Sequence, residues 1–221
     1  DYWYFDSQDT TLYLKQDTKQ DQYFLKSSTD EREKSCNLKS DSSLKTIKKD
    51  GKDVNSYGYF PFNETATSLN ASTYNYGFGT KLQMDFTLTD DGKVETEKAD
   101  GTKEKTSIKF FFSGDDDVWV FIDGQLALDV GGAHGKVSGL LEFGETSDAK
   151  NSVTAYVSKV KKGGTSNSDQ NGNSVKSVRY NGEPISFSAK GTTLTFDKGQ
   201  KHTLTMYYME RGMWESNMAV A

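Results

Sequence analysis

The chain has 221 residues and a formal net charge of −5, and its lysines are scattered among carboxylates instead of forming a basic stripe. This distribution does not favour nucleic acid as a partner. The single cysteine, Cys36, excludes an internal disulfide, and no Cys and His residues are spaced as zinc ligands. No apolar run reaches about 18 residues, so we expect no insertion into a membrane.

Composition favours an all-β fold. Hydrophobic residues make up only 33% of the chain while aromatic residues reach 13%, so a few large side chains must build the core. Two prolines, 20 glycines and frequent Thr, Ser, Asn and Asp are typical of strands joined by polar turns. We expect one domain over residues 1–221, an antiparallel β-sandwich with long surface loops.

The N-terminal part, residues 1–55, predicts short strands and then a surface excursion. Aromatic and aliphatic residues cluster at 1–5, 12–14 and 23–25, which favours strands. Residues 26–55 are rich in Lys, Asp, Glu and Ser with little periodicity, which predicts a solvated loop with one short helix near residues 30–38.

The middle of the chain carries the clearest strand patterns. Apolar and polar residues alternate over residues 82–89, 108–112 and 118–122, which predicts strands with one buried face. Asp91-Gly92 predicts a turn. Asp123-Gly124 lies between apolar runs, where a type I′ hairpin needs positive φ, so a tight hairpin is expected there.

The last third predicts further strands around one insertion. Residues 161–174 are rich in Gly, Ser, Asn and Lys, which indicates a flexible loop insertion. Strand patterns resume afterwards at four places: residues 185–188, 194–196, 204–208 and 218–220.

Three consecutive carboxylates, Asp115, Asp116 and Asp117, precede an apolar strand. Adjacent acids repel one another, so two interpretations stay open: a solvated turn, or a site for a hard cation that takes oxygen ligands. Calcium suits irregular loops better than magnesium does. Neighbouring strand residues point to opposite faces, so a shared ion requires a cis peptide bond between Asp115 and Asp116. Such a bond costs about 3–4 kcal/mol, which two contacts to a divalent cation could offset.

The segment SGDDDVWVFIDGQLALDVGGAHGKVSG resembles the signature of the fibro-slime domain. That domain is a relative of the lectin-like β-sandwich of anthrax protective antigen, which yeast flocculins, epithelial adhesins and many bacterial surface proteins share. YGFGTKLQMDFTL and MYYMERGMWESNMAV resemble flanking strands of the family, so the resemblance runs from about Tyr57 to the C-terminus. Residues 1–55 and 161–174 are not covered.

The resemblance implies a calcium site. In calcium-dependent relatives two successive aspartates joined by a cis peptide hold the ion, which places the pair on Asp115 and Asp116. A second loop there adds one polar side chain and two backbone carbonyls, which correspond here to Glu210 and to Gly212 and Trp214.

The second loop departs from the family at one position. Glu210 replaces the asparagine of the flocculins, which raises the negative charge of the site and leaves the register open by one or two residues. Asn217 is the alternative ligand in that case. Asp115, Asp116, Trp214 and Asn217 are the residues that we expect at the bound carbohydrate.

Other residues admit two interpretations. A structural role for His134 is favoured over a catalytic one, because no nucleophile accompanies it. Trp119 and Phe121 lie in the middle of a strand and are expected in the core instead of forming a sugar platform. Trp214 could stack on a sugar ring. Asn63 and Asn70 begin N-x-S/T sequons, which matter only in a eukaryotic secretory pathway.

These observations predict a calcium-binding, extracellular adhesin module that recognises carbohydrate on a host or cell surface. We expect it to belong to a longer, bacterial surface protein. The alternative is a structural module of a pilus or fibrillar protein, in which calcium only stabilises the fold. An enzyme is not expected. Glycoside hydrolysis needs two carboxylates about 5–9.5 Å apart across a cleft, and Asp115 and Asp116 are too close together for that unless one acts with Glu210. No other catalytic motif is present.

Overall fold

A computed structural model describes most of the chain from residue 77 onward and parts of the chain before it. The described residues are 15–17, 22–26, 46–49, 52–55, 69–70, 77–98, 100–114, 117–132, 134, 137–147, 149–158, 176–180, 183–187, 189–211 and 218–221. Their regular structure is entirely β, which confirms the predicted fold class. Within these residues there is no helix long and apolar enough to span a membrane.

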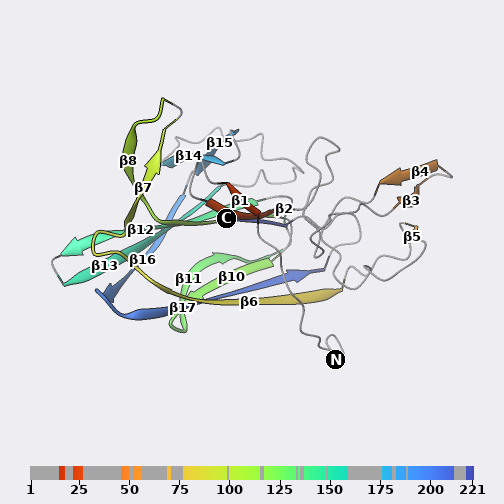
Figure 1. The fold of residues 1–221 in the computed structure, drawn as a ribbon. Helices are drawn as coiled ribbons and strands as arrows, with labels where there is room; N and C mark the ends of the chain where they lie inside the picture. Colours follow the sequence, from red (N-terminus) through yellow and green to blue (C-terminus); the bar gives the residue numbers. More distant parts are fainter. Residues whose placement is uncertain are drawn as a thin grey trace.

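Two sheets form the body of the molecule as stacked layers (Figure 1). The larger sheet has seven strands in the order β1-β2-β18-β9-β12-β13-β16, and the pairs in it are antiparallel. These strands are β1 (Lys15–Asp17), β2 (Gln22–Lys26), β18 (Met218–Val220), β9 (Lys109–Gly114), β12 (Val137–Ser147), β13 (Lys150–Val157) and β16 (Ala189–Asp197).

The second layer is a four-stranded antiparallel sheet in the order β11-β10-β17-β6. Its strands are β6 (Phe78–Thr87), β10 (Asp117–Ile122), β11 (Gln125–Val130) and β17 (Lys201–Glu210). Three small sheets complete the described structure: β3 (Thr46–Lys49) with β4 (Lys52–Asn55) and β5 (Leu69–Asn70), β7 (Lys93–Glu97) with β8 (Lys103–Ser107), and β14 (Lys176–Tyr180) with β15 (Glu183–Phe187).

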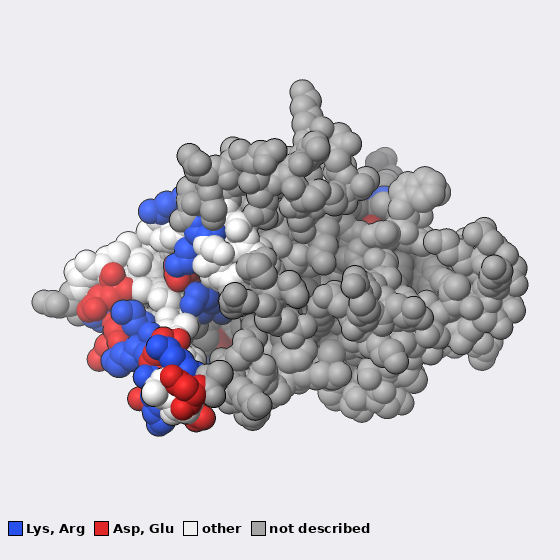
Figure 2. All heavy atoms as spheres, turned by 90° about the horizontal axis from the view of Figure 1, so that it is seen from above, with Lys and Arg blue, Asp and Glu red and all other residues white. Residues whose placement is uncertain are grey.

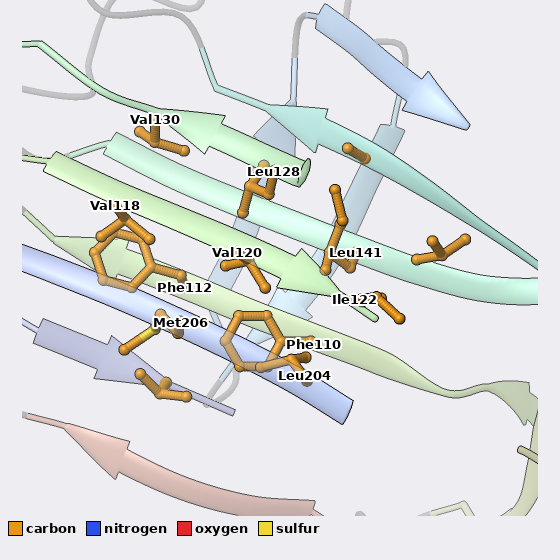
Figure 3. Close-up of a cluster of buried hydrophobic side chains, with 14 of the residues drawn as sticks. Phe110, Phe112, Val118, Val120, Ile122, Leu128, Val130, Leu141, Leu204 and Met206 are labelled. Atoms are coloured by element: carbon orange, nitrogen blue, oxygen red, sulfur yellow. The ribbon is translucent and has the colours of Figure 1, made fainter. Parts of the chain in front are cut away.

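The core lies between the two layers. Strand alternation sends every second side chain inward, and Figure 3 shows inward-facing residues of both sheets packed together. Phe110 and Phe112 of β9 meet Val120 of β10 and Met206 of β17 in this cluster. Burying each such side chain contributes about 1.5–3 kcal/mol, so the alternating segments specify the sandwich.

The predicted hairpin at Asp123-Gly124 is confirmed. Asp123 has φ 51° and Gly124 has φ 77°, and Ile122 pairs with Gln125 across the two-residue turn. The Asp123 carboxylate accepts hydrogen bonds from the Thr203 N–H at 2.9 Å and pairs with His202 Nδ1 at 2.7 Å. The turn is therefore attached to the start of β17.

The predicted core positions of Trp119 and Phe121 are wrong. Both are half-buried and lie outside the core cluster, because Val118, Val120 and Ile122 take the inward face of β10. Successive side chains of a strand point to opposite faces of the sheet. A residue's place in this alternation, and not its distance from the strand ends, therefore decides whether it points into the core. These two aromatic residues lie on the outer face of the four-stranded sheet.

Other predictions have mixed outcomes. Strands predicted at residues 82–89, 108–112, 118–122, 194–196, 204–208 and 218–220 are confirmed by β6, β9, β10, β16, β17 and β18, although β6, β16 and β17 begin four, five and three residues earlier than predicted. Residues 23–25 lie in β2 and 185–187 in β15. The excursion over residues 26–55 contains the hairpin β3–β4, which the sequence did not predict. Residues 1–5, 12–14, the helix at 30–38 and the insertion at 161–174 lie outside the described residues.

Candidate functional site at one end of the sandwich

Several strands begin or end together at one end of the sandwich, next to Asp117. Gly114, the last residue of β9, pairs with Val137 at the start of β12 and with Met218 at the start of β18. Asp117, the first residue of β10, pairs with Met209 near the end of β17. We call the described residues here, namely Gly114, Asp117, 130–132, His134, Val137, 209–211 and Met218, the acidic end.

Buried serines fix the strands below the acidic end. Ser138 Oγ donates to Ser113 Oγ at 3.0 Å, and the Ser138 N–H donates to Ser158 Oγ at 2.8 Å. All three serines are buried, so these bonds join β9, β12 and the residue after β13 inside the protein. The loops at the acidic end therefore start from fixed positions.

Asp117 connects two loops to the start of β10 at this end. Its side chain is only 5% exposed, and its Oδ2 lies 2.6 Å from Arg211 Nε, immediately after β17. Its Oδ1 accepts a hydrogen bond from the Gly132 N–H, in the connection between β11 and β12. Both oxygens contact the protein, so Asp117 serves as a link between loops.

Glu210 is a buried carboxylate at the same end. Alternation along β17 turns it to the same inward side as Tyr208, and it is 1% exposed. Its Oε2 accepts a hydrogen bond from the Tyr208 hydroxyl at 3.0 Å. Glu210 comes one residue after Met209, the partner of Asp117, so this acid lies beside the start of β10.

The remaining predicted site residues lie outside the described residues. These are Asp115, Asp116, Gly212, Trp214 and Asn217. The peptide bond between Asp115 and Asp116 lies outside them too, so its cis geometry stays a prediction. Within the described part of the chain, no three His, Cys, Asp or Glu side chains are close enough to hold a metal ion.

His134 has the contact expected of a structural residue. It is half-buried, and its Nε2 lies 3.0 Å from the Val130 carbonyl, to which it donates. This bond spans the end of β11 and the loop that follows it. The contact agrees with a role in shaping the loop.

Sequence reasoning missed the pairing of Asp117 with Arg211. Asp117 was recognised only as the third member of an acidic run, and nothing local distinguishes it from its neighbours. The signal that could have distinguished Asp117 is the alternation of side chains along β10. Asp117 lies on the same outward side as Trp119 and therefore faces away from Glu210, which points inward.

Comparisons with known proteins found partial similarity to three curated proteins of Dictyostelium discoideum. Protein psiP is 38% identical over 86 residues, which covers 37% of this chain and 9% of psiP. Protein psiO is 41% identical over 63 residues (28% of this chain, 6% of psiO), and protein psiB is 39% identical over 71 residues (32% of this chain, 10% of psiB).

The similarity to the psi proteins is local. The matched part amounts to a tenth or less of the length of each of these relatives. No family model matches the chain, and no solved structure matches it. The fold and the site therefore define the chain no further than an all-β, sandwich-like module with an acidic loop end.

Proposed function

We propose that this chain is an extracellular module that binds calcium at the acidic end and recognises carbohydrate there. The observation that carries the proposal is the position of Glu210, a buried carboxylate one residue beyond the Asp117–Met209 pair. Asp116 is likewise one residue beyond that pair, on the other strand. Consecutive Cα atoms are about 3.8 Å apart, so both acids stay near the same point.

The register of β10 and β17 supports a shared site. Val118 pairs with Tyr208 and Asp117 with Met209, so a shared site requires this ladder to continue by one step and bring Asp116 opposite Glu210. Directly opposed residues of antiparallel strands have Cβ atoms about 4.5–5.5 Å apart, and like charges in that position repel. A hard divalent cation between the carboxylates removes the repulsion, and oxygen is the ligand atom that calcium prefers.

The residues present fit a calcium ion. Asp115, Asp116 and Glu210 would supply carboxylate oxygens, and Gly212 and Trp214 would supply backbone carbonyls. Calcium takes 6–8 oxygen ligands, so vicinal sugar hydroxyls can complete its coordination. Trp214 and Asn217 would then contact the sugar, by stacking and by hydrogen bonding. Asp117, which pairs with Arg211, is not among the proposed ligands.

A place on the cell surface within a longer protein follows from this function. The three psi proteins are far longer than the matched segments, which supports a modular arrangement. An adhesin needs its binding module displayed outside the cell, and calcium is the metal of choice for extracellular modules with millimolar-range sites.

The test is an array of short oligosaccharides probed with and without calcium. We expect a subset of glycans to be bound in calcium and released by chelator, and Asp115→Ala to lose that subset. Asp197→Ala, which changes an exposed aspartate at the end of β16, is the matched control and should bind normally. Calcium binding with no calcium-dependent glycan would instead identify the structural module of a pilus or fibrillar protein.

A further inference from the structure

Aromatic residues gather on the outer face of the four-stranded sheet. Trp119 of β10 pairs with Tyr207 of β17, and Phe121 pairs with Leu126 of β11. Strand parity directs Trp119, Phe121 and Tyr207 outward together. We call Trp119, Phe121, Leu126 and Tyr207 the aromatic face.

This face is open in the described structure. Leu126 is 41% exposed and Tyr207 is 40% exposed, and they are two of three large hydrophobic residues in the described part of the chain with such exposure. In Figure 1 the four-stranded sheet is the outermost layer on its side, and no other labelled strand covers it. A contiguous exposed apolar patch usually marks a binding surface.

The aromatic rings are held in place before any ligand arrives. The Phe121 and Tyr207 rings pack edge to face, with centroids 5.9 Å apart and an interplanar angle of 85°. The Lys81 ammonium lies 6.0 Å from the Tyr207 ring centroid. Trp119 packs closely against Gly131, in the loop after β11: a Cβ atom added to Gly131 would lie only 3.0 Å from Trp119 Cζ2. Little conformational entropy remains to be lost on binding.

The surroundings of the aromatic face match a neutral, hydroxyl-rich partner. Exposed Gln83 and half-buried Thr205 lie opposite each other beside the rings and can hydrogen-bond to hydroxyl groups. Charges of both signs lie on this face: Lys201 pairs with Asp85 at 2.6 Å, and Lys81 and Asp129 lie on its two edge strands, β6 and β11. A strongly charged polymer gains no net attraction from such a surface.

We propose that the aromatic face binds a neutral polysaccharide chain without needing calcium. Sugar rings present apolar C–H faces that stack on aromatic side chains, while their hydroxyls reach the flanking polar groups. An open sheet face suits an extended polymer better than a small sugar, which would need a concave pocket. This site faces away from Glu210, which points into the interior, and is therefore separate from the proposed calcium site.

The test is affinity electrophoresis in gels that contain soluble neutral glucan, mannan or galactan, with chelator throughout. We expect at least one polymer to retard the protein. Tyr207→Ala should weaken that binding about tenfold, whereas Tyr207→Phe should retain it. Tyr23→Ala is the matched control, because Tyr23 is a 56% exposed tyrosine on β2 of the other sheet. Leu126→Ser replaces Tyr207→Ala if that variant does not fold.

Three results would overturn this inference. One is the absence of retardation by every neutral polymer, and another is equal retardation of wild type and the folded aromatic-face variant. The third is concentration-dependent self-association that Tyr207→Ala abolishes in sedimentation velocity, which would make the face a contact between copies. Because chelator removes calcium, the gel experiment measures binding at the aromatic face alone. Failure of polymer binding here and failure of calcium-dependent glycan binding at the acidic end can therefore be told apart.

Discussion

Asp117 shows how one buried charge can organise the loops at the acidic end of the sandwich. Its two oxygens contact Arg211 and the Gly132 N–H, which belong to different loops. A buried carboxylate is stable only when such contacts replace water. Removing Arg211 leaves the Asp117 carboxylate, which is only 5% exposed, without its counter-charge, so the cost of that substitution exceeds the net value of the pair.

A double-mutant cycle tests this link. We expect Asp117→Asn and Arg211→Gln each to lower the free energy of unfolding by about 1–3 kcal/mol, because each breaks a charge-assisted hydrogen bond. The double variant should lose less than the sum, with a coupling of about 1 kcal/mol measured by urea unfolding. Asp129→Asn, on an exposed aspartate that accepts only from the nearby Gly131 N–H, should be nearly neutral. Strict additivity in the cycle would show that the two charges act independently.

At the scale of elements, the β7–β8 hairpin depends on the turn that precedes it. Gly92 has φ 64°, and its carbonyl accepts from the Ile108 N–H at 2.8 Å, on the far side of the hairpin. The hydrogen bond from Lys105 lowers the pKa of the neighbouring Asp91 carboxyl. Further ion pairs, Lys103–Glu95 and Lys98–Glu104, join the strands, and Figure 2 shows positive and negative side chains interleaved here.

Gly92→Ala should be more destabilising than Gly101→Ala. Both glycines have positive φ, so each alanine suffers backbone strain of about 1–2 kcal/mol. A Cβ at Gly92 would also lie 2.9 Å from the Gly144 backbone N, whereas nothing lies within 4 Å of one at Gly101. We expect Gly92→Ala to cost at least about 1 kcal/mol more in chemical unfolding. Equal losses in the two variants would mean that β12 moves away freely.

The same elements show which parts of the fold were accessible from sequence. Apolar alternation is a local signal, so β6, β9 and β10 were predicted, and Asp123-Gly124 specified its hairpin. β7 and β8 are charged and Thr-rich, with KVETE and KEKTS as their sequences, and offer no apolar face to detect. Cross-strand ion pairs, which arise only after folding, join them.

At the scale of the whole molecule, strands that are distant in the sequence pair with each other, and this pairing could not be predicted from the sequence. β18 lies between β2 and β9, and β17 lies between β10 and β6, and no local pattern encodes such neighbours. This arrangement brings Glu210 to the acidic run. The resemblance placed Glu210 in the site, but the ion pair of Asp117 with Arg211 required the sheet register.

Calcium should stabilise the entire sandwich, because the acidic end connects both layers. β9 and β18 belong to the larger sheet and β10 and β17 to the smaller one, so an ion at this end ties the layers together. Binding confined to the native state adds about 2.7 kcal/mol of stability at a hundredfold excess over Kd. For a domain of this size that raises Tm by about 5–10 °C, measured by scanning calorimetry in calcium and in chelator.

Two variants and a second metal ion test whether the rise in Tm comes from calcium bound at the acidic end. Asp115→Ala should fold, since a loop-end ligand is not a core residue, and its Tm should be the same with calcium and with chelator. Asp197→Ala should keep the full calcium shift. Magnesium should substitute poorly, because its strict octahedral geometry suits an irregular loop less well. If wild type melts at one temperature in calcium and in chelator, then no ion occupies the acidic end, and Asp115 and Asp116 form a solvated turn.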